Sequence, residues 1–400
     1  MGDGRARLIL GVCFLMAFFA WGTVFYGNGV YLVALRNFRD WSIGDISLGI
    51  GLFFIAGVPA TLVHGALVDR FGPRWIVAYG AVSVGGGIAM LGVANSLYVL
   101  YAVMFVLGTG YPALATPLVS ATLLPWFRDN YGWALSLALT GASVGGAVLV
   151  PVMVHAIERW GFPATTLATG AIVLVVLLPL AILVLTQPGL DDVERPTVFA
   201  PDVLRDGEFW RLSLACALGL GVQVGFLMHH LAILERHMAV EMAAYAVSAA
   251  VIAAAIGRLV FGYLSRWLAL HVLTAMAYVM QACGIGWLAL AWADWQRLAA
   301  SVLAGFSIGA IVMLPALLVR HRFGPARYGR AYAAVNVALY SLAGISPALV
   351  GFITDRLGSY APSLLLLFAI QVIAASLIGA RAVAAARDRA HSITVRSPSC

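Results

Sequence analysis

Arg258 has the clearest chemical potential of any residue in this sequence, because it is the only charged residue between positions 242 and 263. An arginine in the middle of a membrane-spanning helix costs about 2.5–3.5 kcal/mol on insertion scales, so it usually faces a protein interior or a water-filled cavity. Its guanidinium stays protonated and presents a planar fork of donors that fits a carboxylate. The position therefore predicts a binding site for an organic anion. The alternative is a structural arginine that pairs with a carbonyl group or an acid to hold helices together.

A second group of polar residues recurs every four positions, at Tyr332, Asn336 and Tyr340. Residues with this spacing share one face of a helix. The stripe predicts a hydrogen-bonding wall opposite Arg258, with Asn336 its best candidate. The alternative is interhelical packing, which asparagine and tyrosine also serve.

Four more polar side chains lie deep in apolar stretches and are candidates for the same cavity wall. They are Tyr26, Asn28, Thr116 and Thr140. Taken singly, each also suits an ordinary contact between helices.

His229 and His230 are candidates for proton coupling, because histidine can carry a proton near neutral pH. Adjacent helical residues point about 100° apart, so we expect only one of the two to face the interior. Glu235, about one turn further along, is the next candidate. The alternative is a hydrogen-bonded structural histidine.

The sequence does not indicate an enzyme. We find no nucleotide-binding loop, no cluster of metal ligands and no nucleophile beside a base, so no cofactor or metal is expected. The net charge of +7 does not indicate a nucleic-acid partner, because the chain has no lysine and its 24 arginines are scattered in short loops.

These residues are carried by a polytopic helical membrane protein. The chain is 62% hydrophobic and only 10% charged, and apolar runs of about 20 residues recur at the length that crosses a bilayer. In lipid such runs must be helices. We expect twelve spans, at residues 8–35, 44–68, 75–94, 97–125, 132–157, 163–186, 210–234, 242–264, 271–292, 298–319, 328–353 and 361–382.

The predicted spans form two bundles, at residues 1–186 and 209–382. Residues 187–208, rich in proline and acids, predict a linker, and residues 383–400 a disordered tail. Of the 24 arginines, 17 fall in the termini, the linker and the loops on the same side. The positive-inside rule places that side in the cytoplasm, as in a multi-pass protein of the cell (inner) membrane. We expect a monomer in the lipid bilayer.

The two bundles repeat each other at an offset of 197 residues. Gly65 matches Gly262, Tyr131 matches Tyr328, and the segment ending at Gly161 matches the one ending at Gly358. Such an offset indicates a parallel repeat, with the binding site between the halves.

The loop after the second span, Gly65-Ala-Leu-Val-Asp-Arg-Phe-Gly-Pro-Arg74, resembles the signature loop of the major facilitator superfamily. The resemblance implies a gate on the cytoplasmic side, at Gly65, Asp69, Arg70, Gly72 and Arg74. In it Asp69 faces a helix N-terminus or an arginine across the interface. The alternative is that these charges set topology only.

Within this superfamily the chain resembles the oxalate/formate antiporter and monocarboxylate transporter branch. The similar stretches are Val68–Arg74, Pro125–Arg128 with Tyr131-Gly132, Leu204–Trp210 and Gly257-Arg258.

The branch resemblance implies that Arg258 is a carboxylate ligand, that Tyr26 lines the cavity and that Tyr332 lies below the site. A lysine of the oxalate transporter is matched here by Val335, which favours a monoanion over a dianion. The acid of mammalian-type members is matched by Ala254, so their proton-relay acid is absent here.

Together these features predict an all-α membrane transporter for a small organic anion, most simply a monocarboxylate. Transport would proceed by alternating access and be coupled to protons or to anion exchange. The alternatives are an exporter of another small molecule or drug, and a non-transporting sensor on the same fold.

Overall fold

Every element in the described part of the chain is a helix, as expected where no water can satisfy exposed backbone groups. The computed structural model describes residues 2–127, 130–185 and 205–394. The elements are α1 (Gly2–Phe19), the π-helix η1 (Ala20–Phe25), α2 (Gly27–Arg39), α3 (Ile43–Phe71), α4 (Pro73–Leu91), α5 (Leu97–Gly110), the 3-10 turn η2 (Tyr111–Ala113), α6 (Thr116–Leu123), α7 (Tyr131–Trp160), α8 (Phe162–Val184), α10 (Gly207–Glu235), α11 (Val240–Leu264), α12 (Leu270–Leu290), α13 (Asp294–Leu357) and α14 (Ala361–Thr394).

The described residues hold twelve helices that are long and apolar enough to cross a membrane, which confirms the predicted number. The first span joins α1, η1 and α2, and the fourth joins α5, η2 and α6. The tenth and eleventh spans, residues 294–324 and 334–357, both belong to α13. Most of the predicted linker, residues 187–204, lies outside the described part, and its last residues already start α10 at Gly207.

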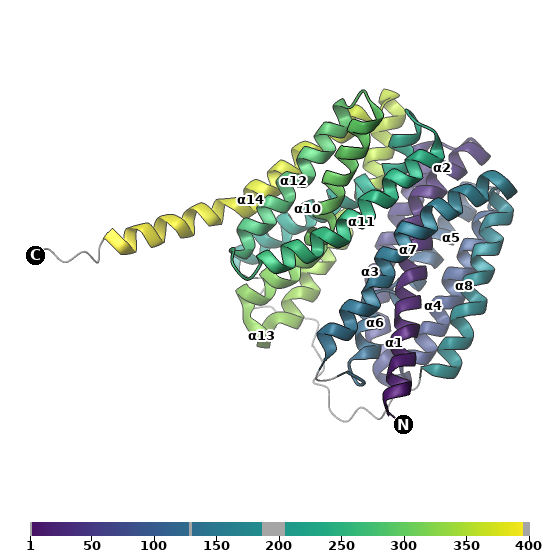
Figure 1. Ribbon diagram of the computed structural model, residues 1–400, viewed down its shortest axis with the longest axis horizontal. Helices are drawn as coiled ribbons and strands as arrows, with labels where there is room; N and C mark the ends of the chain where they lie inside the picture. The colour runs from purple at the N-terminus through teal and green to yellow at the C-terminus, as the bar shows by residue number, and fades with distance from the viewer. Residues whose placement is uncertain (1, 128–129, 186–204, 395–400) are drawn as a thin grey trace, which may run out of the picture.

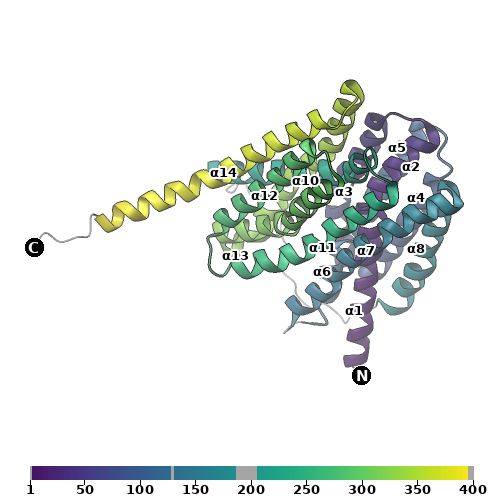
Figure 2. The ribbon, with the colours of Figure 1, turned by 45° about the horizontal axis from the view of Figure 1, so that its top comes forward.

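The chain after the last span differs from the expected tail. The span ends at Gly379, but α14 continues as helix to Thr394 (Figures 1 and 2). This segment is rich in alanine and arginine, which have high helix propensity, so helix can extend past the membrane. Residues 395–400 lie outside the described part.

Two glycines turn the chain sharply between successive spans. Gly72 has φ 78° and ψ 166°, and Gly324 has φ 71° and ψ 168°. A side chain would be strained in this left-handed region. Each glycine stands between a phenylalanine and a proline, so one helix ends and the next begins within a single residue. The sequence signal for the turn at Gly324 is that Phe-Gly-Pro, which surrounds Gly72, occurs again there.

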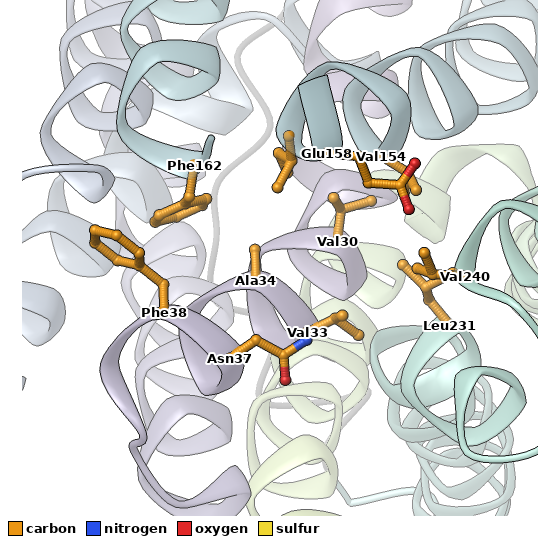
Figure 3. A pocket seen from close by; sticks show the side chains of 11 residues that line it. Val30, Val33, Ala34, Asn37, Phe38, Val154, Glu158, Phe162, Leu231 and Val240 are labelled. Carbon is orange, nitrogen blue, oxygen red and sulfur yellow. The ribbon is translucent and has the colours of Figure 1, made fainter. Parts of the chain in front are cut away.

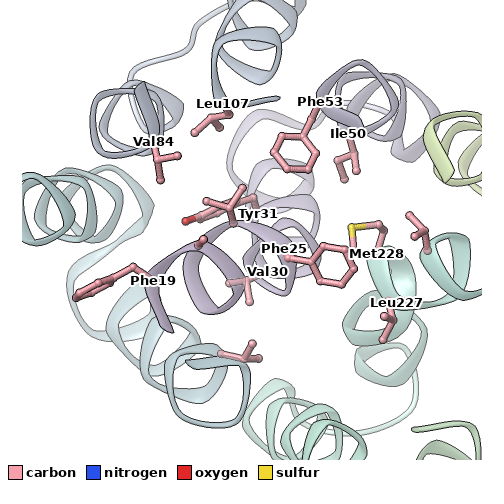
Figure 4. Packing of buried hydrophobic residues seen from close by; sticks show 14 of the residues in the cluster. Phe19, Phe25, Val30, Tyr31, Ile50, Phe53, Val84, Leu107, Leu227 and Met228 are labelled. Atoms are coloured by element: carbon pink, nitrogen blue, oxygen red, sulfur yellow. The ribbon is translucent and has the colours of Figure 1, made fainter. Parts of the chain in front are cut away.

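The N-terminal half (residues 2–185) and the C-terminal half (residues 205–394) lie side by side (Figure 1). Their apolar cores join where α10 meets α2. Figure 4 shows Leu227 and Met228 of α10 beside Phe25 and Val30 of the first span. α3 and α13 also cross closely, because a Cβ on Gly51 would collide with the carbonyl oxygen of Gly344. This packing holds the candidate site between the halves.

Candidate functional site

Arg258 lies on α11, half-buried, against the tenth span. A Cβ built on Gly309 would lie 2.8 Å from the Arg258 Cβ and 3.0 Å from its backbone nitrogen, so the missing side chain at Gly309 allows this close approach. Among the residues that the structure describes, no carboxylate pairs with the guanidinium and no carbonyl oxygen accepts a hydrogen bond from it. The alternative hypothesis, in which Arg258 holds helices together by pairing with an acid or a carbonyl group, therefore has no such partner among the described residues.

Tyr26 faces Arg258 from the other half. It stands between η1 and α2, and its ring lies directly over Gly146 of α7. The Arg258 charge acts on the Tyr26 hydroxyl. The π-helix just before Tyr26 is a rare local widening that is frequent at functional sites. The arginine and this tyrosine, from different halves, therefore lie within electrostatic range of each other.

Tyr111 and Tyr340 extend this arrangement. The Tyr111 hydroxyl lies within electrostatic range of both Tyr340 and Tyr26. Tyr111 and Tyr340 also line a small cavity of about 40 Å³ between the halves, together with Phe53, Phe54 and Thr61. We refer to Arg258, Tyr26, Tyr111 and Tyr340 as the central cluster.

The other two residues of the predicted stripe sit differently. Asn336 is half-buried one turn before Tyr340 and makes no hydrogen bond within the described residues. Its amide is therefore available to a ligand. Tyr332 is half-buried and packs against the core of the C-terminal half, and its place below the site stays a prediction.

Asn28, Thr116 and Thr140 are spread over three helices. Asn28 is fully buried in α2, and neither of its amide atoms has a hydrogen-bond partner in the described structure. Thr116 begins α6 and is half-buried. Thr140 is exposed and donates to the carbonyl oxygen of Leu137 in its own helix. The hydroxyl proton of Thr140 is thus already used, while its oxygen can still accept a hydrogen bond.

Thr61 and Gln223 were missed by sequence reasoning, although the repeat pointed to both. Thr61 lies 197 residues before Arg258 and lines the small cavity. Gln223 lies 197 residues after Tyr26, is fully buried, and has no hydrogen-bond partner for either amide atom in the described structure. The signal was the offset of 197 residues between the halves, which leads from Arg258 back to Thr61 and from Tyr26 on to Gln223.

His229 is fully buried at the interface between the halves. Its Nε2 lies 2.9 Å from the carbonyl oxygen of Pro347, and this oxygen can only accept, so Nε2 carries the proton. Nδ1 then accepts from the hydroxyl of Tyr360 at 3.2 Å. The Ser47 hydroxyl of the N-terminal half lies 3.3 Å from Nε2. His229 thus connects three segments in its neutral form.

His230 is also fully buried, but it faces its own half. Its Nε2 lies 2.8 Å from the Ser301 hydroxyl of α13. The two histidines point in different directions, as their adjacency on a helix predicts. Only His229 contacts the other half.

Charged groups join the halves at the end of the bundle opposite the N-terminus, which we call the far end. The Asp355 carboxylate accepts from the backbone nitrogens of Ile43 at 3.2 Å and Gly44 at 2.6 Å, at the N-terminus of α3. Arg36 and Glu235 form an ion pair at 3.4 Å. With the Ser47–His229 contact, we call these interactions the far-end latch. Glu235 and His229, predicted as proton carriers, both belong to it.

The predicted gate lies at the opposite end of the bundle, where the structure continues α3 as helix to Phe71, so that Gly65 and Arg70 belong to its last turns and the expected loop is reduced to Gly72. Arg70 stacks over Phe71 and Arg74 over Trp75, each at 5.1 Å from the ring centroid. Gly65 is exposed, and Gly72 makes the left-handed turn. The side chain of Asp69 lies outside the described part, so its predicted partner remains a prediction.

A separate apolar cavity of about 350 Å³ opens between the halves near the far end (Figure 3). Val33 and Ala34 of α2 and Leu231 of α10 line it, and Asn37 and Glu158 supply its polar groups. Neither a cation nor a member of the central cluster reaches it from the described residues. It therefore does not suit an organic anion.

The chain was compared with known proteins. The family model described as Major Facilitator Superfamily matches residues 10–347. Monocarboxylate transporter 9 of Pongo abelii is 28% identical over 51% of this chain and 39% of its own length. The fujikurins efflux protein of Gibberella fujikuroi is 27% identical over 57% of this chain and 50% of its own length. The matches span about half the length of the first curated relatives, or less.

The fold was compared with solved structures in the same way. The nucleoside transporter NupG, solved as a point mutant, superposes with a TM-score of 0.80 at 12% identity, over 94% of this chain and 99% of that one. At this identity the likeness concerns the arrangement of the helices alone.

Proposed function

Because this chain belongs to the major facilitator superfamily and is a membrane transporter rather than an enzyme, we propose that it carries a small organic anion by alternating access. One observation carries the proposal: Arg258 has no acidic partner among the described residues, and it lies within electrostatic range of Tyr26 of the other half. A guanidinium kept without a counter-ion in a membrane protein needs one from elsewhere. A transported carboxylate supplies it.

The proposed substrate is a monocarboxylate. Arg258 gives the cluster one permanent charge, and Asn336 and the tyrosine hydroxyls, which we assign to the same site, are neutral donors and acceptors. A bidentate pair with Arg258 would fix the carboxylate, and Tyr26 and Tyr340 would orient it. The small, largely aromatic cavity beside Tyr340 favours a compact organic group on that acid.

Alternating access assigns the latch a role. If the N-terminus lies in the cytoplasm, as the arginine distribution favours, the far end faces outward. The far-end latch then closes the outer side, and the central cluster is reached from the cytoplasm. Opening to the outside requires Asp355 to leave the N-terminus of α3 and Glu235 to leave Arg36. A proton on His229 or Glu235, or exchange against a second anion, would drive this step.

A second candidate is export of a different organic molecule, which the efflux relative favours. A cation exporter needs a buried acid at its site, and the central cluster holds an arginine instead. An anionic or neutral exported compound would still depend on Arg258.

The test is uptake into proteoliposomes of labelled lactate, pyruvate, formate, oxalate, benzoate and a quaternary ammonium ion, with and without a pH gradient. We expect monoanions to move and Arg258→Gln to reduce uptake by about 100-fold, the cost of a charge-assisted pair. Arg266→Gln is the matched control, since Arg266 is exposed beyond α11. Stimulation by the gradient identifies proton coupling, and stimulation by internal anion identifies exchange. Movement of the cation, or anion uptake that survives Arg258→Gln, would refute the proposal.

A further inference from the structure

A polar cavity of about 460 Å³ lies at the far end of the C-terminal half, well separated from the central cluster. It is bounded by the turns after α10, after α12 and between α13 and α14. Arg236, His237 and Arg297 supply its basic side chains, and no acidic residue is among the described residues that line it. This is a third kind of cavity, distinct from the aromatic central one and from the apolar one of Figure 3.

Both arginines of this cavity are held in place. Arg297 is only 7% exposed; it donates to the Asp294 carboxylate at 2.8 Å and to the carbonyl oxygen of Ala291 at 3.2 Å. Arg236 donates to the carbonyl oxygen of Gly358 at 2.8 Å, and its guanidinium lies 4.8 Å from the ring centroid of Tyr360. Each guanidinium has five N–H donors, so these contacts leave donors free on both.

Two acids lie near these arginines without lining the cavity. Asp294 balances the charge of Arg297 in an ion pair at 2.8 Å, although its side chain is 70% exposed and lies outside the cavity. Glu235 pairs with Arg36 across the latch and also lies within electrostatic range of Arg236. Arg236 therefore forms no ion pair among the described residues, and Arg297 keeps donors that its paired acid does not use.

His237 reports the same positive potential. Burial lowers the pKa of His237 below its ordinary value, the guanidinium groups of Arg297 and Arg236 lower it further, and the Asp294 carboxylate acts against them. Burial is the larger cause of this shift, and the smaller part, due to the two guanidinium groups, is the part that also favours an anion beside His237.

The N-terminus of α14 also meets this cavity, at Ala361. The first backbone N–H groups of a long helix have no intrahelical partner and attract anions. The Ala361 nitrogen donates to the Ser359 hydroxyl at 3.2 Å. This end of the helix adds to the two arginines and the histidine.

The cavity lies close to a group of tryptophans at the α12–α13 turn. Trp292 and Trp295 are 77% and 63% exposed, and the Trp287 and Trp295 rings lie 6.3 Å apart. Tryptophan gathers at the level of lipid headgroups. The cavity is thus placed where phosphate groups of lipids as well as dissolved anions can reach it.

We propose that this cavity is a second anion site that binds a phosphate group between Arg236, Arg297 and the N-terminus of α14. Two fixed guanidinium groups and a helix N-terminus suit the multiple oxygens of phosphate. The phosphate comes either from solution or from the headgroup of an anionic lipid. The site does not depend on which substrate binds at Arg258.

The experiment uses the purified full-length protein in two arms. In detergent, thermal unfolding is followed while inorganic phosphate is added. In nanodiscs of phosphatidylcholine with a minor fraction of phosphatidylglycerol, native mass spectrometry counts the anionic lipid retained. Binding in the first arm alone assigns a dissolved phosphate, and binding in the second alone assigns a lipid headgroup; either result supports the site.

Three variants decide whether the binding belongs to this cavity. Arg236→Gln and His237→Glu should each weaken binding by about tenfold, because one removes a cation and the other adds a carboxylate. His237 is exposed, so its variant should fold even if Arg236→Gln does not. Arg356→Gln removes an exposed far-end arginine outside the cavity and should bind like wild type.

The dependence on pH gives an independent readout. Because the pKa of His237 is lowered, His237 is neutral near pH 7 and gains its proton only at lower pH. Retention of phosphatidylglycerol, whose phosphodiester keeps its charge, should therefore rise as the pH falls below about 6.5, the ordinary pKa of histidine, and His237→Gln should abolish the rise. No binding in either arm, or equal binding by wild type, Arg236→Gln and His237→Glu, overturns the proposal.

Discussion

The central cluster and the far-end latch use charge in opposite ways. In the latch, Arg36 faces Glu235 and the Asp355 carboxylate caps the N-terminus of α3. In the central cluster, Arg258 forms no ion pair with an acid among the described residues, and its charge acts on the neutral Tyr26. A charge that already has its partner holds two helices together, while a charge without one is kept for a ligand. The same residue type, arginine, therefore serves structure at one depth and, as we propose, recognition at another.

The strongest test of this difference between the central cluster and the latch is to remove the charge of Arg258. We expect Arg258→Leu to lose about 100-fold in uptake while its midpoint of thermal unfolding stays equal to that of wild type or rises. The physical reason is that the folded protein holds a guanidinium with no counter-ion, and leucine removes that cost. The measurement is tryptophan fluorescence during heating, made beside the uptake assay.

The control for this prediction is Glu235→Gln in the latch. It leaves Arg36 without its partner, so it should lower the unfolding midpoint by an amount that corresponds to about 1 kcal/mol. If Arg258→Leu were destabilising to the same degree as Glu235→Gln, the two regions would not differ in kind and Arg258 would be structural.

A smaller effect is expected when the latch loses the charge at Asp355. Asp355→Asn keeps the shape but removes the negative charge at the N-terminus of α3, which costs about 1 kcal/mol and shifts the balance of latched and open states about fivefold. Positions 160 and 292 are exposed residues at the far ends of the two halves. Spin labels at these positions should then show a larger fraction of molecules in which the two labels are far apart. The exposed Cys283 must be replaced first.

Asp294→Asn is the matched control, because Asp294 is an acid in the first turn of α13 in the C-terminal half and makes no described contact with the N-terminal half. An unchanged distance distribution in Asp355→Asn would show that other contacts hold the far end closed.

The sequence predicted the helices better than it predicted the relations between them. Twelve spans follow from composition, because lipid permits only one way to satisfy the backbone. The absence of other charged residues in the sequence around Arg258 already suggested that this arginine has no acidic partner on its own helix. By contrast, the latch depends on Asp355 reaching residues more than 300 positions earlier, and no local pattern encodes such a pairing. The roles of His229 and Glu235 are obscured for the same reason, since their partners Ser47 and Arg36 belong to the other half.

The two adjacent histidines give the finest comparison, because they share a helix and differ only in what they face. His229 contacts Ser47 of the N-terminal half through its Nε2 atom, whereas His230 binds Ser301 within its own half. A proton added to His229 must be accommodated in the latch, where the carbonyl oxygen of Pro347 and the Tyr360 hydroxyl already occupy both ring nitrogens.

The quantity to compare is the ratio of uptake with a pH gradient to uptake without it. We therefore expect His229→Gln to reduce this ratio several-fold. We expect His230→Gln to leave the ratio unchanged even if it lowers stability. The readout is that ratio rather than the rate, because a merely structural role would change both rates together. Equal loss of the ratio in both variants would show that contact with the N-terminal half does not decide which histidine carries the proton, and an intact ratio in His229→Gln would leave Glu235 as the carrier.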